Sequence, residues 1–136
     1  MMGFLLDSNA CIRALNDLNS SVARKIAQIP PAQINLCTVV QMELFYGAYK
    51  SARIEDNLAI LARFFCLFKV LPFDSQAALK MGIIRAHLAK KGTPIGPYDL
   101  QIAAIALVNN LILVTHNTRE FKRIEGLQIE DWEEGD

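Results

Sequence analysis

Short apolar runs alternate with helical patterns along the whole chain, and this alternation constrains the fold more than any other feature. Each run has the length of a buried strand, and the runs lie at residues 3–7, 33–39, 69–73, 111–115 and 127–131. Strands separated by helices of this length predict a parallel sheet that is covered on both faces, with right-handed crossovers. The expected fold class is therefore α/β, with a central parallel sheet between two layers of helices.

Capping residues and hydrophobic spacing mark the helices between these runs. Ser8 is expected to cap a helix through about Leu15, and Gly92 to end the longest one. The other caps are expected at Ser20 or Ser21 and at Asp74 or Ser75. The expected helices cover residues 8–15, 21–29, 39–51, 53–68, 74–91 and 98–110, and residues 115–121 form a polar loop or a short helix.

Length and charge predict one domain with a distinct end. The 136 residues suffice for a single core, which we place in residues 1–129. Residues 130–136 contain five acids and no base, so we expect a short, solvated acidic tail. The tail holds five of the 14 acidic residues, which leaves a domain with 14 basic residues and an excess of positive charge, a surface suited to a polyanion.

The location expected for the protein is the cytoplasm. No apolar stretch approaches the roughly 18 to 20 residues that a membrane-spanning helix needs. The N-terminus lacks the basic segment of a signal peptide, and Asp7 interrupts its apolar run. We therefore expect no contact with a membrane.

Three carboxylates occupy positions that this fold brings toward one pocket. Asp7 ends the first buried strand, Glu43 lies on a mainly apolar helix face, and Asp99 opens a helix after Gly96 and Pro97. In open parallel sheets, ligands bind at the carboxyl ends of the strands. Two carboxylates 4 Å apart repel by about 4 kcal/mol at an effective dielectric constant of 20. Several can stay ionised together only around a cation, and oxygen ligands suit Mg²⁺ or Mn²⁺.

Four segments, in this order and spacing, resemble a PIN-domain protein of the VapC toxin type: FLLDSN (4–9), MELFYG (42–47), GTPIGPYDLQIAAIAL (92–107) and LILVTHNTREF (111–121). The resemblance implies a parallel sheet of about five strands in the order 3-2-1-4-5. It also implies an endoribonuclease that depends on Mg²⁺ or Mn²⁺ and cuts tRNA or another structured RNA. A VapB-like antitoxin and a homodimer are the implied protein partners.

The resemblance assigns the site residues by position. Asp7, Glu43 and Asp99 correspond to the first three acids of the family, and we favour Glu120 as the fourth catalytic and metal-binding acid. Many relatives carry an aspartate soon after the last core strand, where this chain has Asn117, so Asn117 is an alternative neutral ligand and the number of metals stays open.

Further polar and basic residues are expected around these acids. The supporting polar residues are Ser8, Asn9 and Thr38, which can hydrogen-bond water or orient an acid but can equally cap helices or form turns. Expected phosphate contacts are Arg13, Lys90, Lys91, Arg119, Lys122 and Arg123.

Three other functions are compatible with parts of the sequence. A metal-free ribonuclease would use His87 and His116, although His116 lacks an evident partner in the sequence. An aspartate-based phosphatase would need a second acid where this chain has Asn9. A non-catalytic interaction module would use the large hydrophobic share of 52% to bind a partner.

Overall fold

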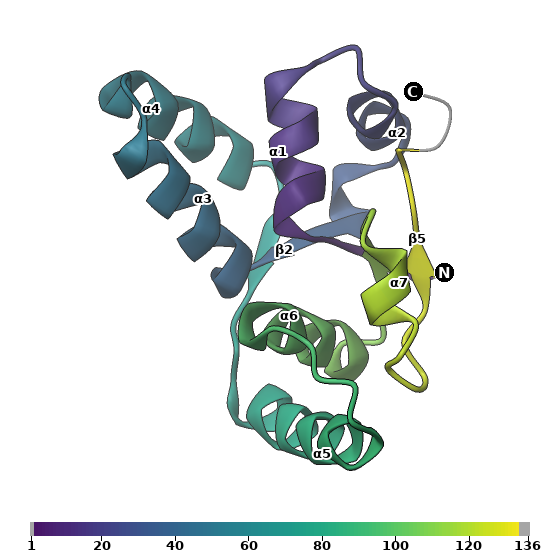
Figure 1. Ribbon diagram of the computed structural model, residues 1–136. Helices are drawn as coiled ribbons and strands as arrows, with labels where there is room; N and C mark the ends of the chain where they lie inside the picture. The colour runs from purple at the N-terminus through teal and green to yellow at the C-terminus, as the bar shows by residue number, and fades with distance from the viewer. Residues whose placement is uncertain (1, 134–136) are drawn as a thin grey trace.

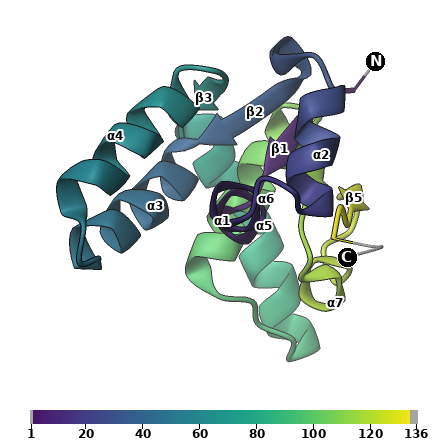
Figure 2. The same ribbon diagram turned by 90° about the horizontal axis from the view of Figure 1, so that it is seen from above.

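A computed structural model describes residues 2–133 and contains a five-stranded, fully parallel sheet in the order β3-β2-β1-β4-β5. This result confirms the α/β fold class and the strand order (Figures 1 and 2). The central strand β1 pairs with β2 on one side and with β4 on the other. The strands are β1 (Phe4–Leu6), β2 (Ile34–Cys37), β3 (Lys69–Leu71), β4 (Ile112–Val114) and β5 (Ile129–Glu130).

Helices cover both faces of the sheet, as Figures 1 and 2 show. Helices α1 and α2 lie on one face, and α6 lies on the other, buried between the sheet and α5. The pair α3 and α4 projects to one side of the sheet. The helices are α1 (Ser8–Asn16), α2 (Ser21–Gln28), α3 (Thr38–Lys50), α4 (Ile54–Phe65), α5 (Ser75–Lys91), α6 (Pro97–Val108) and α7 (Thr118–Phe121), with a 3-10 turn at Pro31–Gln33.

Most helix ends follow the expected capping chemistry. The side chains of Ser20 and Asp74 accept hydrogen bonds from the backbone at the starts of α2 and α5. Gly92 ends α5 with a φ of 70°, a left-handed conformation that glycine adopts without a steric penalty. The expected cap of α1 was Ser8, but Asp7 takes this position, because its Oδ1 atom accepts a hydrogen bond from the Ala10 amide at 2.8 Å.

The C-terminal edge of the sheet differs from the expected acidic tail. Glu130 belongs to β5, which pairs with β4, so the boundary expected at residue 129 falls inside a strand. Trp132 is buried and packs edge-on against Phe4, with 5.1 Å between the ring centroids. Residues 130–133 are therefore part of the folded domain, and residues 134–136 of the expected tail lie outside the described part of the chain.

The sheet supplies a rigid base for the first acid of the site. Leu5 and Leu6 have no exposed surface, and Leu113 and Val114 of the neighbouring strand are equally enclosed. Such packing fixes the direction in which the end of β1 points. Between residues 2 and 133, no helix has both the length and the apolar character needed to cross a membrane.

Candidate active site

Asp7 lies directly after β1, where the chain order of the sheet reverses between β1 and β4. Its side chain is only 4% exposed, and its amide donates to the Val114 carbonyl at 3.1 Å. Burial raises the pKa of Asp7 to about 6, although hydrogen bonds from Thr115 and from the Ala10 amide oppose this shift. The charge of Asp99 raises the pKa further, so Asp99 acts electrostatically on Asp7.

Glu43 reaches the same region from α3. Its Oε1 atom accepts a hydrogen bond from the hydroxyl of Ser8 at 2.5 Å, across 35 residues of sequence. Ser8 is buried and directly follows Asp7, so this contact ties Glu43 to the residue that is adjacent to the first acid in sequence. The expected supporting role of Ser8 thus has a definite geometry, in which the hydroxyl holds a carboxylate and does not cap the helix.

Asp99 stands in the first turn of α6, after Gly96 and Pro97. Proline fits the first helical turn because its missing N–H would have no partner there. Burial raises the pKa of Asp99, and the charges of Glu120 and Glu43 raise it further. Asp99 is therefore the acid that links the other three electrostatically.

Glu120 lies on the short helix α7, which follows β4. The side-chain amide of Asn117 donates to Glu120 Oε2 at 3.2 Å, so the two alternatives for the fourth position are in contact with each other. In this arrangement Glu120 carries the negative charge and Asn117 orients it. We refer to Asp7, Glu43, Asp99 and Glu120 together as the four-acid site.

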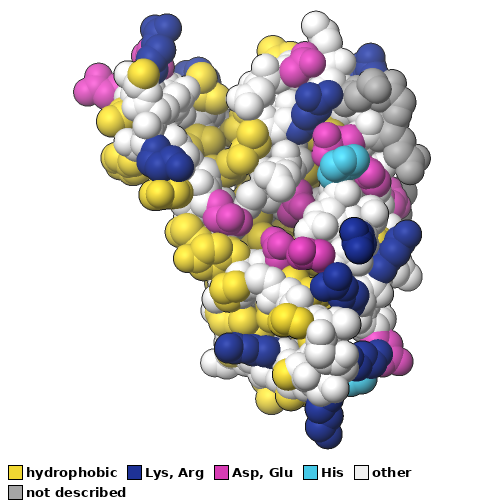
Figure 3. Space-filling view, in the orientation of Figure 1, with side chains coloured by type: hydrophobic (Ala, Val, Ile, Leu, Met, Phe, Trp, Pro, Cys, Tyr) yellow, Lys and Arg dark blue, Asp and Glu magenta, His cyan; other side chains and the backbone are white. Residues whose placement is uncertain are grey.

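The charge and burial of the four acids bear on whether they are ligands of a hard cation. Within residues 2–133, no lysine or arginine forms an ion pair with any of its acids. Burial, and then like charges, raise the pKa values of Asp7 and Asp99, which means that the folded environment disfavours ionisation of these two acids. A cation would remove this repulsion, and an all-oxygen donor set fits Mg²⁺ or Mn²⁺. Figure 3 shows acidic side chains gathered at the middle of this face.

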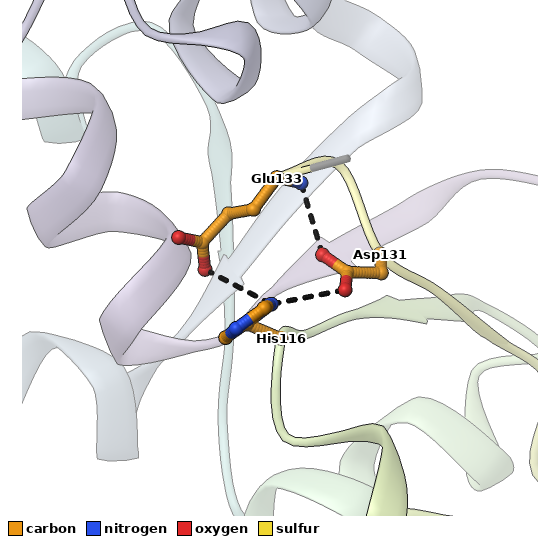
Figure 4. A group of neighbouring side chains, drawn as sticks. All are labelled: His116, Asp131 and Glu133. Carbon is orange, nitrogen blue, oxygen red and sulfur yellow. Dashed lines mark hydrogen bonds and ion pairs between the residues drawn. The ribbon is translucent and has the colours of Figure 1, made fainter. Parts of the chain in front are cut away.

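A second group was missed by the sequence analysis and consists of His116, Asp131 and Glu133. Figure 4 shows the three side chains converging. One ligand atom from each lies within 4.8 Å of the others, so this group could hold a metal ion. His116 Nδ1 lies 2.9 Å from Asp131 Oδ2 and 3.7 Å from Glu133 Oε2. The hydrogen bond with Asp131 and the nearby charge of Glu133 raise the pKa of His116.

The sequence contained one signal for this second group. If residues 127–131 form an edge strand next to residues 111–115, then Asp131 and His116 lie at the same end of neighbouring parallel strands. Assigning Asp131 and Glu133 to a solvated tail hid this proximity. We call these three residues the His116 group, and it adjoins the four-acid site because Glu133 acts electrostatically on Asp7.

The remaining polar candidates take different positions. Asn9 and Asn117 line a cavity of about 500 Å³ together with Arg13 and His116. The hydroxyl of Thr38 accepts a hydrogen bond from the Phe73 amide at 3.3 Å, which is a structural role. His87 and His116 line two different cavities. The two histidines therefore do not form the acid–base pair of a metal-free ribonuclease.

The basic candidates lie mainly on one side of the acids. Arg13 faces Glu133, with 3.7 Å between Nε and Oε1. The others lie at the end of α5 or on and after α7, and of these Lys90, Lys91, Arg119 and Lys122 are exposed, whereas Arg123 is half-buried. In Figure 3, basic side chains gather beside the acidic middle of the face, over α7 and α5.

A parallel sheet between helical layers, with Asp7 at its switch point and three further acids on α3, α6 and α7, defines an α/β protein with an acidic candidate site. The chain belongs to the PIN domain family, whose model matches residues 4–127, and within that family it is of the VapC type. It is 43% identical over 132 residues to the tRNA(fMet)-specific endonuclease VapC of Salmonella typhimurium, covering 97% of this chain and 99% of the relative.

Other relatives agree with this assignment. Ribonuclease VapC2 of Rickettsia felis is 35% identical over 133 residues, covering 97% of this chain and 99% of the relative. Among solved structures, the DNA-bound VapBC complex of Salmonella typhimurium matches with a TM-score of 0.91 at 43% identity, over 97% of this chain and 99% of that chain. VapBC-1 of nontypeable Haemophilus influenzae matches with a TM-score of 0.86 at 33% identity, over 96% and 98%.

Proposed function

We propose that the protein is a divalent-metal-dependent endoribonuclease that cleaves tRNA, with Asp7, Glu43, Asp99 and Glu120 holding Mg²⁺ or Mn²⁺. The observation that carries this proposal is electrostatic: Asp99 acts on Asp7, Glu43 and Glu120 act on Asp99, and no basic side chain of residues 2–133 forms an ion pair with any of the four. The names of the relatives, an endonuclease specific for tRNA(fMet) and a ribonuclease, support an RNA substrate.

The residues of the chain prepare the site for this chemistry. Two hydrogen bonds hold Asp7 at the end of β1, the Ser8 hydroxyl holds Glu43, and the Asn117 amide holds Glu120. Such contacts keep the acids in place before RNA arrives, which lowers the reorganisation needed for catalysis. When bound, a divalent cation supplies an activated water nucleophile and stabilises the charge that develops on the phosphate.

RNA cleavage with a matched pair of variants tests this proposal. Asp7 and Asp74 both cap helices, and asparagine is as good a cap as aspartate. We expect Asp7→Asn to abolish cleavage of total tRNA in Mg²⁺ or Mn²⁺, and Asp74→Asn to cleave like the unsubstituted chain. EDTA should stop cleavage by both active proteins. Cleavage that persists in EDTA, or in the Asp7→Asn variant, would overturn the metal-site proposal.

We further infer that a VapB-like antitoxin binds next to the four-acid site. A cavity of about 280 Å³ between α1, α3 and α4 is lined by apolar residues, among them Ile12, Leu44 and Ile60, and includes Glu43. An antitoxin segment with an apolar face and one basic residue fits this lining, because the base can pair with Glu43. The solved complexes that match are VapBC pairs, which supports this partner.

A homodimer is also proposed, on the basis of exposed apolar side chains. Tyr46 and Tyr49 of α3 are 61% and 62% exposed, and Leu79 of α5 is 69% exposed. Large exposed apolar side chains that gather on helices often mark interfaces. Light scattering of the isolated chain tests the proposal, and a mass of one chain at micromolar concentration would contradict it.

A further inference from the structure

Another cavity lies between α5, the C-terminal part of α6 and the turn after α7. Its volume is about 330 Å³, and none of its lining residues belongs to the four-acid site or to the His116 group. The buried side chains of Ile84, Leu88 and Ile124 form its floor. Ligand-binding cavities begin at about this size and commonly combine apolar walls with a few polar groups.

The rim of the cavity is cationic. Lys80 and His87 of α5 and Arg123 after α7 line it, and Glu125 is the acid among the lining residues. Within residues 2–133, neither Lys80 nor Arg123 forms an ion pair, and Arg123 donates only to the Pro94 carbonyl, at 3.3 Å. Two cationic side chains over an apolar floor therefore have no ion-pair partner among residues 2–133, although Glu125 lines the same cavity.

The helix pattern connects this cavity with the four-acid site. Lys80, Ile84, His87 and Lys91 follow one another at spacings of four, three and four, so they share one edge of α5. Helix α6 runs back along α5 after a short loop, and it carries Leu107 at the cavity and Asp99 at the four-acid site. With a rise of 1.5 Å per residue, these two α6 residues are about 12 Å apart along the helix axis.

An RNA strand has the chemistry that this cavity requires. An unstacked base is flat and largely apolar, and it can stack on an imidazole or a guanidinium group, while its phosphate needs cations. At 3.4 Å per nucleotide of a stacked strand, the axial separation of about 12 Å between Leu107 and Asp99 corresponds to about three or four nucleotides. Figure 3 shows positive side chains over α7 and α5, beside the acidic middle of the face.

We propose that this cavity is an RNA subsite, in which an unstacked nucleotide a few positions from the scissile bond places its base against Ile84, Leu88 and Ile124 and its phosphate near Lys80 and Arg123. His87 stacks on the face of the base that is turned away from these apolar residues. The subsite rests on the proposed ribonuclease function, and it extends that function by adding a contact that recognises RNA longer than the cleaved dinucleotide.

Binding measurements in an inactive background test the subsite. The Asp7→Asn chain is titrated against fluorescein-labelled tRNA and against a labelled dinucleotide, followed by anisotropy. We expect the additional substitutions Lys80→Ala and His87→Ala together to weaken tRNA binding about tenfold, because one stacked base and one phosphate contact are lost. Affinity for the dinucleotide should stay unchanged. In 4-thiouridine crosslinking of tRNA, modified peptides should come from residues 80–88 or 123–126.

Arg85→Ala is the matched control, because Arg85 is an exposed cation of α5 that does not line the cavity. It should change tRNA affinity less than twofold. Equal losses of tRNA affinity in Arg85→Ala and in the double variant, or no loss in either, would overturn the subsite. Absence of any tRNA binding would also overturn it.

Cleavage by the unsubstituted chain is measured separately. Cavity-dependent binding without cleavage would overturn the ribonuclease proposal alone, and cleavage with cavity-independent binding would overturn the subsite alone.

Discussion

At the scale of single residues, Asp7 combines two roles that oppose each other energetically. Its side chain caps α1, which favours an ionised, hydrogen-bonded carboxylate. Its burial and the neighbouring acids disfavour the same ionised state. A side chain that served only as a cap would be more stable as asparagine, so the retained carboxylate points to a task that needs charge.

The raised pKa of Asp7 makes stability depend on pH. Because the folded pKa of about 6 exceeds the usual value of 3.8, the folded protein binds the proton more tightly than the unfolded chain. This contribution to stability is complete below pH 3.8 and is lost as pH rises through 6. In EDTA, we expect Asp7→Asn to be more stable than the unsubstituted chain at pH 7, by up to about 3 kcal/mol, and the difference to vanish near pH 3.5.

Urea unfolding across this pH range measures the effect, and Asp74→Asn serves as the control because Asp74 is an exposed helix cap. The difference in unfolding free energy between Asp74→Asn and the unsubstituted chain should not follow the same pH profile. A difference for Asp7→Asn that is constant from pH 3.5 to 7 would show that the folded environment does not disfavour ionisation of Asp7.

The contact between Asn117 and Glu120 allows a second prediction about individual residues. Glu120 contributes charge to the four-acid site, whereas the Asn117 amide orients it. We expect Glu120→Gln to weaken Mn²⁺ binding more than Asn117→Ala, because loss of a charged ligand removes attraction that loss of a neutral neighbour leaves in place. Isothermal titration of Mn²⁺ into each variant distinguishes them. The reverse order would make Asn117 the fourth ligand.

At the scale of elements, the last strand and the residues after it join distant parts of the domain. Ser21 at the start of α2 donates to the Trp132 carbonyl at 2.6 Å, and the Trp132 indole donates to Glu130 Oε1 at 2.9 Å. The Trp132 ring also packs against Phe4 of β1. These side-chain contacts thus add to the backbone pairing with β4 in positioning a two-residue strand.

We expect Trp132→Ala to destabilise the domain by about 3 to 5 kcal/mol, the range for removal of a buried large aromatic side chain. Trp132→Phe should restore most of this loss, because the edge-on contact with Phe4 remains possible while the hydrogen bond to Glu130 does not. Urea unfolding followed by circular dichroism is the suitable measurement, since Trp132 is the only tryptophan of the chain. A loss below 1 kcal/mol would indicate that residues 130–133 detach from the sheet in solution.

The elements also show how far local patterns determine the fold. The run Phe4-Leu5-Leu6 and the spacing of Ala77, Met81, Ile84 and Leu88 are enough to predict a strand and a helix. The strand order does not follow from such patterns, and here it was implied by the resemblance. Local patterns also do not predict contacts between residues that are distant in sequence. The Ser8–Glu43 hydrogen bond spans 35 residues, and so Ser8 looked like a cap.

The candidate site was partly predictable for the same reason. Asp7 lies between the end of a strand and the start of a helix, and Asp99 lies in the first turn of a helix that follows a loop. Sequence alone identifies both positions. The helix of Glu43 is apolar nearly all round, so its periodicity could not show which way the acid points. His116 gained partners only because the edge strand brings Asp131 and Glu133 back to the sheet. A charge run near a chain end suggests solvation, and this inference fails where a buried tryptophan interrupts the run.

At the scale of the whole molecule, opposite charges are separated on one face. Acids gather at its middle, and basic side chains lie beside them over α7 and α5. A polyanion cannot approach uncompensated carboxylates without a cation between them, whereas basic surroundings attract it. The charge distribution therefore suits a substrate that is guided by the basic side and bound at the acidic centre only together with metal.

The last prediction concerns metal binding and the stability of the whole domain. A ligand that binds only the folded state adds RT ln(1 + [L]/Kd), about 1.4 kcal/mol at a free concentration tenfold above Kd. We expect Mn²⁺ to raise the free energy of unfolding of the unsubstituted chain by this amount at pH 7 and EDTA to reverse the gain. The experiment also decides between the two groups that can hold metal. If the four-acid site binds the ion, Asp7→Asn removes the gain and His116→Ala retains it, since His116 is exposed and contributes no ligand there. The opposite pattern would place the ion in the His116 group and contradict the assignment of the four acids.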